Sequence, residues 1–462
     1  MRPGFDFQGK RVLVVGLART GVAVSLFAAG YGATVTATDE KPESALGETA
    51  ARLRAAGVRL ELGGHPSSIF FEQDLIVVSP GVPANLAPMV LAHVGGVPVW
   101  GEIELAWRFL RGKLVAVTGS NGKTTTTSLV GHILESAGMP VLVGGNIGAP
   151  LISLVERSTD STVTVAEVSS FQLETIEAFR PEVGVLLNLT PDHLDRHASF
   201  EAYAAAKMRL FENQLERDFA ILNADDPEVT RRMPSKSHVF WFSRQKRVAE
   251  GAYLRDDQIV FRLDGSETVI GKRSDIPLRG EHNVENVLAA CAAAFLAGAT
   301  PSAIASGVKT FRGVEHRLEF VAEIGGVSFY NDSKATNVDA ALKAVEAFPG
   351  PLLVILGGRD KGAPYAPLAE ALRTKGRAAL LIGESADKIA ADLGDAVPCL
   401  RAETLDRAIE MAAERARPGD TILLAPACSS FDQFENYEQR GSVFKQLVAQ
   451  LEKRSAASAH KG

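Results

Sequence analysis

Short apolar, β-rich segments alternate with alanine-rich stretches of helical periodicity along most of the chain. This alternation is typical of α/β folds, in which helices cover a mostly parallel sheet. In the first hundred residues the predicted strands lie at 11–16, 34–39, 75–81 and 97–101. The pattern then restarts, with strands expected at 113–119, 140–145, 162–170, 183–190 and 219–226.

The spacing of the apolar segments changes between residues 238 and 271. Three segments follow one another closely there, and Asp264-Gly265 lies between two apolar runs. An Asp-Gly pair in this setting is typical of a tight hairpin turn. We therefore predict a small antiparallel edge, followed by a helix over 280–297.

A third α/β set begins near residue 311. Its strands are expected within 317–332 and at 351–358, 378–385 and 421–427. The whole pattern predicts an α/β fold of three consecutive domains, with bounds 1–101, 102–310 and 311–462. A small, polar tail from about residue 453 is expected to be disordered.

Composition limits the function classes. Of the 462 residues, 46% are apolar and 23% are charged, an ordinary balance for a globular protein. The formal net charge of -6 argues against a nucleic-acid or anionic-membrane partner. No apolar run reaches the length of a membrane span, so we expect no membrane insertion. The N-terminus also lacks the pattern of a signal peptide.

The cysteines indicate a compartment. Cys291, Cys399 and Cys428 are too few and too scattered for a disulfide framework or a zinc site. A reducing compartment is the simplest home for such thiols, and we therefore expect a cytoplasmic protein.

The segment VAVTGSNGKTT, residues 115–125, predicts a phosphate-binding turn. It does not meet the strict pattern G-x-x-x-x-G-K-[ST], because Val117 stands where the first glycine would be. Its context nevertheless favours phosphate: a buried strand precedes it, a helix N-terminus follows, and Lys123 supplies a full positive charge. The alternative is an ordinary capped helix start, since Ser120 and Asn121 are good N-cap residues.

Two other glycine turns follow strands. GLARTG, residues 16–21, resembles the dinucleotide fingerprint G-x-G-x-x-G, with Ala18 in place of the middle glycine. NAD, another nucleotide-type ligand and a purely structural turn all remain open for it. GGRDKG, residues 357–362, lies where α/β domains bind ligands, but such turns are also common without one.

Carboxylates and histidines in the second set are candidates for metal binding. Glu167 ends a predicted strand beside the phosphate turn, where Mg²⁺ would need oxygen ligands. The segment NLTPDHLDRH, residues 188–197, clusters Asp192, His193, Asp195 and His197, which could equally stabilise a turn. By composition and periodicity alone, Lys207 would be an exposed lysine on a helix.

Taken together, these segments resemble the Mur ligase family of ATP-dependent, amide-forming enzymes. Nine segments match in order along nearly the whole chain. They are GSNGKTT, GGNIG, EVSSFQLE, NLTPDHLDRH, AAKMRLFEN, GEHNVEN, EHRLE, NDSKATN and ACSSFDQFENYEQRG. The family writes its phosphate loop as T-G-[ST]-N-G-K-[ST]-T, which accounts for the missing first glycine.

Within the family, NDSKATN and FDQFENYEQRG resemble the members that join D-glutamate to UDP-N-acetylmuramoyl-L-alanine. The D-N-P-[RA] motif of the diaminopimelate-adding relative is not found. This resemblance implies Rossmann-like first and third domains and a central P-loop ATPase-type domain. It also implies that the first glycine turn binds UDP rather than NAD, and that the enzyme makes a peptidoglycan precursor through an acyl phosphate and a tetrahedral intermediate.

The resemblance implies roles for individual residues. ATP would be bound by the phosphate loop and by three residues further along: Gly119, Ser120, Asn121, Gly122, Lys123, Thr124, Thr125, Asn283, Asn286 and Arg317. Two Mg²⁺ ions would be bound by Thr124, Glu167, His193 and Lys207, the lysine being carbamylated by CO₂. Lys123, Glu167, His193 and Lys207 would form the catalytic set.

Two further sets follow from the same resemblance. The UDP-sugar would be contacted by Leu17, Ala18, Arg19, Thr20, Asp39, Ser79, Gly81 and Asn146. D-glutamate would be contacted by Lys334, Thr336, Lys361, Ser430 and Tyr437. Tyr437 departs from the family pattern, which has phenylalanine there. No further macromolecule is required, and we expect a monomer.

Other functions are less consistent with the sequence. Another Mur-type ligase or a folylpolyglutamate-type ligase would share the ATP residues, but not the first domain and the C-terminal motif. An NAD-dependent oxidoreductase would leave residues 119–125 and 427–441 without a role. A noncatalytic nucleotide-binding regulator would not need Glu167, His193 and Lys207 together.

Overall fold

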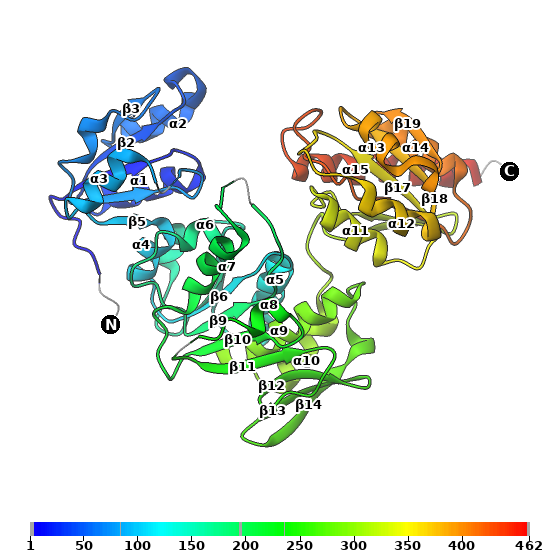
Figure 1. Ribbon diagram of the computed structural model, residues 1–462, viewed down its shortest axis with the longest axis horizontal. Coiled ribbons are helices and arrows are strands. Elements are labelled where there is room, and N and C mark those ends of the chain that lie inside the picture. The colour runs from blue at the N-terminus through cyan, green and yellow to red at the C-terminus, as the bar shows by residue number, and fades with distance from the viewer. Residues whose placement is uncertain (1–3, 84, 194–195, 235, 460–462) are drawn as a thin grey trace. The chain divides into compact units, whose positions relative to one another are not determined.

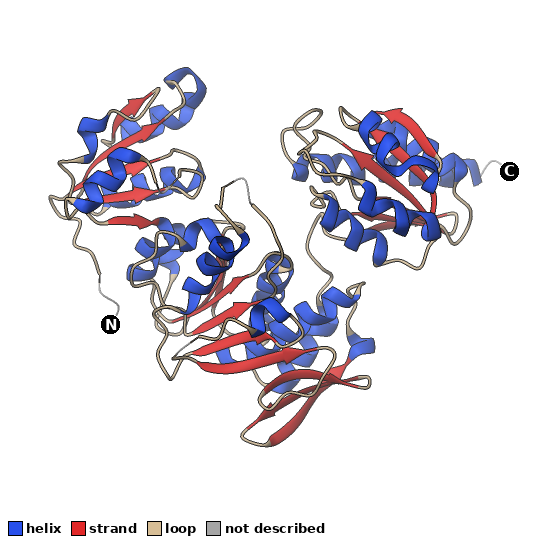
Figure 2. Ribbon diagram, in the orientation of Figure 1, coloured by secondary structure: helices blue, strands red, loops and turns tan. Residues whose placement is uncertain are grey.

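The computed structural model describes residues 4–83, 85–193, 196–234 and 236–459. It contains three sheets, and the chain divides into two compact units. The first unit comprises residues 1–276 and 284–311, and the second comprises 277–283 and 312–462. Figures 1 and 2 show the strands of each sheet lined by helices. The predicted α/β class with mostly parallel sheets is confirmed, whereas the predicted domain bounds stay predictions.

The first sheet has the order β3-β2-β1-β4-β5 and is parallel throughout. Its strands are β1 (Arg11–Val15), β2 (Thr34–Asp39), β3 (Arg59–Leu62), β4 (Leu75–Val78) and β5 (Val99–Gly101). The helices of this region are α1 (Arg19–Gly30), α2 (Glu43–Ala55), η1 (Ser67–Phe70), α3 (Ala87–Val94) and α4 (Glu102–Phe109).

The sequence RVLVV of β1 explains why this sheet is covered on both faces. Val12 and Val14 belong to one apolar cluster, and Leu13 and Val15 belong to another. Since successive side chains of a strand point to opposite faces, a continuous apolar run must be buried on both.

The second sheet has nine strands in the order β14-β13-β12-β11-β10-β9-β6-β8-β7. They are β6 (Lys113–Thr118), β7 (Val141–Gly145), β8 (Val163–Glu167), β9 (Val183–Leu186), β10 (Phe219–Asn223), β11 (His238–Ser243), β12 (Gly251–Arg255), β13 (Gln258–Leu263) and β14 (Ser266–Lys272). The helices are α5 (Lys123–Ser136), η2 (Leu151–Arg157), α6 (Ser170–Leu173), α7 (Phe200–Met208), η3 (Arg209–Phe211), α8 (Pro227–Thr230), η4 (Arg273–Asp275), α9 (Glu281–Ala297) and α10 (Pro301–Thr310).

The predicted hairpin and helix are confirmed. Asp264 and Gly265, both at positive φ, connect the antiparallel strands β13 and β14. α9 covers the helix expected over 280–297.

The antiparallel edge is smaller than predicted. β11 pairs with β10 in parallel, and β12 pairs with β11 in parallel, so antiparallel pairing begins only at β12–β13. At the end of β11, the carboxylate of Asp225 accepts hydrogen bonds from the Ser243 hydroxyl at 2.6 Å and the Arg244 N–H at 2.7 Å. The chain then returns through residues 244–250 to the level of Trp241, whose N–H donates to the Glu250 carbonyl at 3.0 Å, so β12 runs in the same direction as β11.

The third sheet, in the second unit, has the order β15-β16-β20-β17-β18-β19. Its strands are β15 (Glu319–Ile324), β16 (Val327–Asn331), β17 (Leu352–Gly357), β18 (Gly376–Ile382), β19 (Cys399–Glu403) and β20 (Thr421–Leu424). Only β15–β16 is antiparallel among the described pairs. The helices are α11 (Val338–Glu346), α12 (Ala366–Lys375), α13 (Ala386–Leu393), η5 (Gly394–Ala396), α14 (Leu405–Arg415) and α15 (Tyr437–Ala459).

The prediction of a disordered tail from about residue 453 is wrong for the described part. α15 continues to Ala459, and residues 460–462 lie outside the described residues. Phe444 and Val448 bury one side of this helix in an apolar cluster, which supports its continuation into a polar segment.

Candidate functional site

The phosphate turn joins β6, in the middle of the second sheet, to α5. Two of its glycines are required by geometry. Gly122 has φ 87°, and a Cβ there would lie 2.2 Å from Oδ1 of Asn286. A Cβ on Gly119, at φ 149°, would lie 2.9 Å from Cβ of Leu187. The chain therefore needs glycine at both positions to enter α5 in this way.

The segment after β9 holds this turn in place. The Asn121 N–H donates to Oδ1 of Asn188 at 2.8 Å, and Nδ2 of Asn188 donates back to the Asn121 carbonyl at 3.0 Å. Ser120 Oγ accepts from the Thr190 N–H and donates to the Thr190 carbonyl, both at 2.9 Å. A turn fixed in advance loses little conformational freedom when it binds a polyphosphate.

Lys123 places a positive charge on the same turn. Its Nζ donates to the carbonyls of Gly119 and Ser120, each at 2.8 Å. The N-terminus of α5 adds a partial positive charge directly behind it. Together, the lysine and the helix end form a site suited to the phosphates of a nucleotide.

Glu167 ends β8, the strand next to β6, and is 2% exposed. Its Oε1 accepts from Nδ2 of Asn146 at 2.8 Å. Its Oε2 is buried and has no hydrogen-bond partner among the described residues. A buried carboxylate oxygen without a partner is costly unless a cation or donor completes it, which fits the predicted role of a Mg²⁺ ligand.

Lys207, predicted from composition to be exposed, is 2% exposed on α7. Its Nζ lies 3.5 Å from Oγ1 of Thr118 and 4.7 Å from the centre of the Tyr203 ring. Burial, followed by the positive charge of Lys123, lowers the pKa of Lys207 well below its ordinary value. Asp192 and Glu167 act on the pKa of Lys207 in the opposite direction, so three charged side chains act on this one amine.

His193 lies in a turn with φ 54°. Its ring contacts the ring of Phe171 at 4.9 Å, and its Nε2 lies 3.6 Å from Oδ2 of Asp192. His197 contacts the same Phe171 ring at 5.4 Å and is a buried turn residue, with Nε2 3.0 Å from Oγ of Ser170. Asp195 lies outside the described residues.

The side chains near the phosphate turn could hold Mg²⁺ only if ligands other than His, Cys, Asp and Glu take part. No group of three or more His, Cys, Asp or Glu side chains within the described ranges is arranged to hold a metal ion. Oxygen ligands would have to come also from Thr124, from a carbamylated Lys207 and from the phosphates. Thr124 lies in the first turn of α5, the position this requires.

All eight residues predicted to contact the UDP-sugar line one cavity of about 420 Å³ in the first unit. Two of them hold the glycine turn of residues 16–21. Oδ2 of Asp39 accepts from the Leu17 N–H at 2.6 Å, and Oγ of Ser79 donates to the Gly16 carbonyl at 2.8 Å. A Cβ on Gly21 would lie 1.8 Å from the Gly16 carbonyl oxygen, so glycine is required there, whereas Ala18 fits the turn.

The remaining ATP candidates divide between the units. Asn286 contacts the phosphate turn at Gly122, as described above. Asn283 and Arg317 belong to the second unit. Nδ2 of Asn283 donates to the Arg279 carbonyl at 2.6 Å, and Arg317 acts electrostatically on the buried carboxyl of Asp332.

The D-glutamate candidates gather at one edge of the third sheet. They follow β16, β20 and β17, which are adjacent and parallel, so their carboxyl ends share an edge. Nζ of Lys334 donates to the Tyr437 hydroxyl at 2.9 Å, and Nζ of Lys361 lies 3.4 Å from Oγ1 of Thr336. Ser430 is buried and lies in the segment after β20, the segment that leads to Tyr437. Tyr437 thus supplies a hydroxyl that the expected phenylalanine would lack.

Sequence reasoning missed two buried charged residues at this edge. Arg440 is 1% exposed and donates to the carbonyls of Ser333 and Cys428 at 2.8 and 3.2 Å. Burial raises the pKa of Asp332 to about 7, and Arg317 opposes the rise. Asp332 lies in NDSKATN and Arg440 lies in FDQFENYEQRG, two segments that carry the family resemblance. Their place in these segments was the one sequence signal that could have indicated a role.

The phosphate turn on a mostly parallel sheet is typical of a nucleotide-binding α/β protein. Family models identify its kind more closely. A Mur ligase MurD-like N-terminal domain matches residues 10–101, a Mur ligase middle domain matches 117–294, and a Mur ligase glutamate ligase domain matches 316–428. The chain belongs to the Mur ligase family.

Whole-length relatives agree with these matches. A protein of Acidobacterium capsulatum named UDP-N-acetylmuramoylalanine--D-glutamate ligase is 55% identical, with 98% of each chain covered. A protein of Solibacter usitatus with the same name is 54% identical, with 96% of this chain and 99% of the relative covered.

Solved structures share the fold at low identity. A UDP-N-acetylmuramate-alanine ligase from Thermotoga maritima has a TM-score of 0.59 at 20% identity, covering 96% of this chain and 99% of its own. A pseudomurein peptide ligase type C from Methanothermus fervidus has a TM-score of 0.58 at 21% identity, covering 96% and 100%.

Proposed function

We propose that this protein joins D-glutamate to UDP-N-acetylmuramoyl-L-alanine at the expense of ATP, in peptidoglycan precursor synthesis. The observation that carries the proposal is the 55% identity, over 98% of both chains, to a relative named for this activity. The phosphate turn with the buried Lys207 beside it, and the cavity lined by the eight predicted UDP-sugar residues, support it independently.

The chemistry assigns each region a task. The γ-phosphoryl group of ATP passes to the substrate carboxylate, which gives an acyl phosphate and ADP. The amine of D-glutamate attacks this acyl carbon and loses a proton, and phosphate leaves the tetrahedral intermediate. Lys123 and the turn amides hold the transferring phosphates, because negative charge gathers there in both steps.

Glu167, Thr124, His193 and Lys207 would hold Mg²⁺. When bound, Mg²⁺ offsets the negative charge of the phosphates. The lowered pKa of Lys207 favours its uncharged amine, the form that reacts with CO₂ to give a carbamate. The carbamate would turn a cation that repels Mg²⁺ into an oxygen ligand.

The finer expectations belong to the same proposal. Two Mg²⁺ ions fit the set of candidate metal ligands. A monomeric enzyme and a cytoplasmic location fit the small-molecule substrates. Cys291, Cys399 and Cys428 are free thiols, as a reducing compartment favours. Among the described helices, none combines the length and apolar character needed to cross a membrane.

Amino-acid-dependent phosphate release tests the proposal. The protein is incubated with ATP, Mg²⁺ and UDP-N-acetylmuramoyl-L-alanine, and D-glutamate, L-glutamate and diaminopimelate are added separately. We expect release with D-glutamate alone. Release with diaminopimelate but not D-glutamate would assign the chain to a different Mur-type activity.

A further inference from the structure

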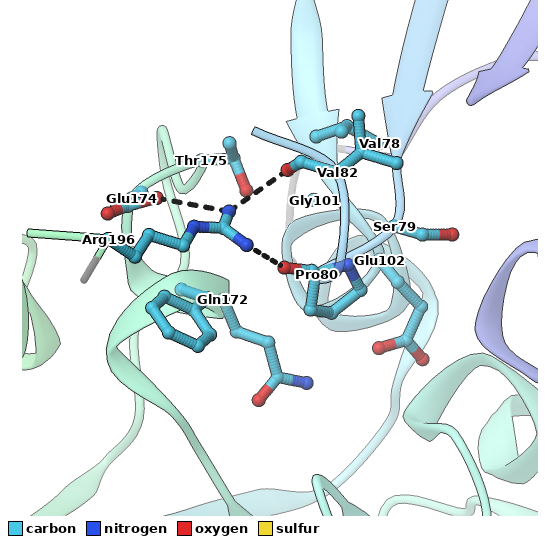
Figure 3. Close-up of a pocket in the computed structure, with 11 residues that line it drawn as sticks. Val78, Ser79, Pro80, Val82, Gly101, Glu102, Gln172, Glu174, Thr175 and Arg196 are labelled. Atoms are coloured by element: carbon cyan, nitrogen blue, oxygen red, sulfur yellow. Dashed lines mark hydrogen bonds and ion pairs between the residues drawn. The ribbon is translucent and has the colours of Figure 1, made fainter. Parts of the chain in front are cut away.

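Arg196 connects two segments that are far apart in the sequence. Its Nη1 donates to the Pro80 carbonyl at 2.9 Å, and its Nη2 donates to the Val82 carbonyl at 3.0 Å (Figure 3). Nη2 also lies 3.7 Å from Oε2 of Glu174. A planar guanidinium is suited to this task, because its donors form a rigid fork that spans two carbonyls.

The two carbonyls belong to a turn that forms part of the wall of the UDP-sugar cavity. The Val82 N–H donates to the Ser79 carbonyl at 2.9 Å, which closes a turn with Pro80 and Gly81 at its corner. Residues 79–82 all line the cavity, whereas Arg196 lines only a small cavity behind them. Arg196 therefore supports the wall of the UDP-sugar cavity from the side that faces away from the cavity. It is not among the residues that line the cavity, so it is not placed to touch the ligand.

The other end of Arg196 belongs to the turn that carries His193. The N–H groups of Arg196 and His197 both donate to the His193 carbonyl, at 3.1 and 3.0 Å. The Arg196 guanidinium packs over the ring of Phe171 at 4.2 Å, and His193 contacts the same ring. The placement of this guanidinium is thus linked to that of the His193 turn.

We propose that Arg196 is a positioning residue that, from its place in the His193 turn, holds the wall of the UDP-sugar cavity in shape. Residues 79–82 hold their shape for the UDP-sugar because the guanidinium fixes the Pro80 and Val82 carbonyls. The identity of the two ligands rests on the proposed function.

Arg196→Met tests this role, since methionine keeps an extended side chain against Phe171 and removes every donor. Arg232→Met is the matched control. Arg232 is 23% exposed against 21% for Arg196, donates to the Glu228 carbonyl at 2.8 Å and packs over Phe200, all within the central region. Binding of UDP-N-acetylmuramoyl-L-alanine and of ATP is titrated calorimetrically for each variant, alongside thermal unfolding.

We expect Arg196→Met to weaken UDP-sugar binding roughly tenfold, as the loss of charge-assisted bonds predicts, and to leave ATP binding unchanged. Arg232→Met should change neither affinity. Arg196→Lys, with one ammonium in place of the fork, should stay weaker than wild type and serves as the second variant should Arg196→Met fail to fold.

Two results would overturn the role. One is wild-type UDP-sugar affinity in both Arg196 variants, and the other is an equal loss of UDP-sugar and ATP affinity, which would mark a general folding defect. Failure of the wild-type protein itself to bind the UDP-sugar would instead refute the proposed function, and the inference with it.

Discussion

The turns at residues 16–21 and 119–122 occupy equivalent places in two sheets. Each follows a strand with parallel neighbours on both sides, β1 or β6, and each leads into a helix. Gly16 and Gly119 both have positive φ, 89° and 149°. By position alone, both turns are sites where an α/β sheet binds a ligand.

The groups that anchor the two turns differ in charge. The first turn is held by the carboxylate of Asp39, which accepts from the Leu17 N–H at 2.6 Å. The second is held by the neutral amide of Asn188 and carries the ammonium of Lys123. Asp39 is thus used to fix the backbone of the first turn, whereas Lys123 supplies positive charge at the second, where a triphosphate needs it. The comparison teaches that two turns with similar backbone paths are distinguished by the side chains that hold them and by those they carry.

The largest effect on activity is expected beside the second turn, from Lys207→Ala on α7. Loss of a group that would hold the metal should cost several kcal/mol of barrier, roughly 10³-fold in kcat. Formate or acetate should restore part of the activity by replacing the carbamate oxygens. Steady-state phosphate release with and without these carboxylates measures both effects, and full activity without them would contradict the assignment of Lys207.

Lys123→Met should lower single-turnover phosphoryl transfer roughly 10²- to 10³-fold, because it removes the positive charge of the turn itself. Carboxylates should not rescue this variant. Lys113→Met is the control, since Lys113 begins β6, the strand that leads into the turn, and donates to the Leu296 and Ala297 carbonyls at 3.3 and 3.1 Å. Equal losses in the two variants would show that the charge at the turn has no special role.

Gly122→Ala should strain the second turn and displace Asn286. A non-glycine residue in the left-handed region costs about 1–2 kcal/mol, measurable by denaturant unfolding. Gly138→Ala, at φ 72° with nothing within 4 Å of the added Cβ, should share that cost. Only Gly122→Ala should also weaken ATP binding, roughly tenfold; equal ATP affinity in the two variants would separate Asn286 from the ATP site.

Asp39→Asn should have the smallest effect, on the first turn. The neutral amide is a weaker acceptor for the Leu17 N–H, so KM for the UDP-sugar should rise about fivefold with kcat nearly unchanged. Asp74→Asn is the control, because Asp74 accepts the Arg11 N–H at 2.8 Å at the opposite end of the same strand. A rise of KM in both variants would indicate loss of sheet stability rather than of turn support.

The buried strands and the phosphate turn could be predicted from the sequence because local pattern determines them. β3 and β19 were not predicted, since as edge strands they carry Arg59, Glu61, Arg401 and Glu403 and lack a continuous apolar run. The parallel pairing of β11 and β12 was missed because the path of the connecting segment 244–250 sets the direction of β12, and this mostly polar segment carries no strand pattern.

Site residues could be predicted where a sequence motif carries the chemistry. They could not be predicted where their placement depends on partners far away in the sequence. Composition places Arg196 and Arg440 at the surface. They are largely or fully buried because carbonyls 114 and 107 residues away, at Val82 and Ser333, accept their donors. Similarly, nothing in the sequence around Lys207 indicates burial without the resemblance, since its neighbours on α7 are mostly alanines.

Crossed titration of the two turns tests the central claim most directly. UDP-N-acetylmuramoyl-L-alanine and ATP are each titrated into the wild-type protein, Asp39→Asn and Lys123→Met. The account predicts that Asp39→Asn weakens only UDP-sugar binding and Lys123→Met weakens only ATP binding. Weaker ATP binding in Asp39→Asn with unchanged UDP-sugar binding, or the reverse in Lys123→Met, would contradict it.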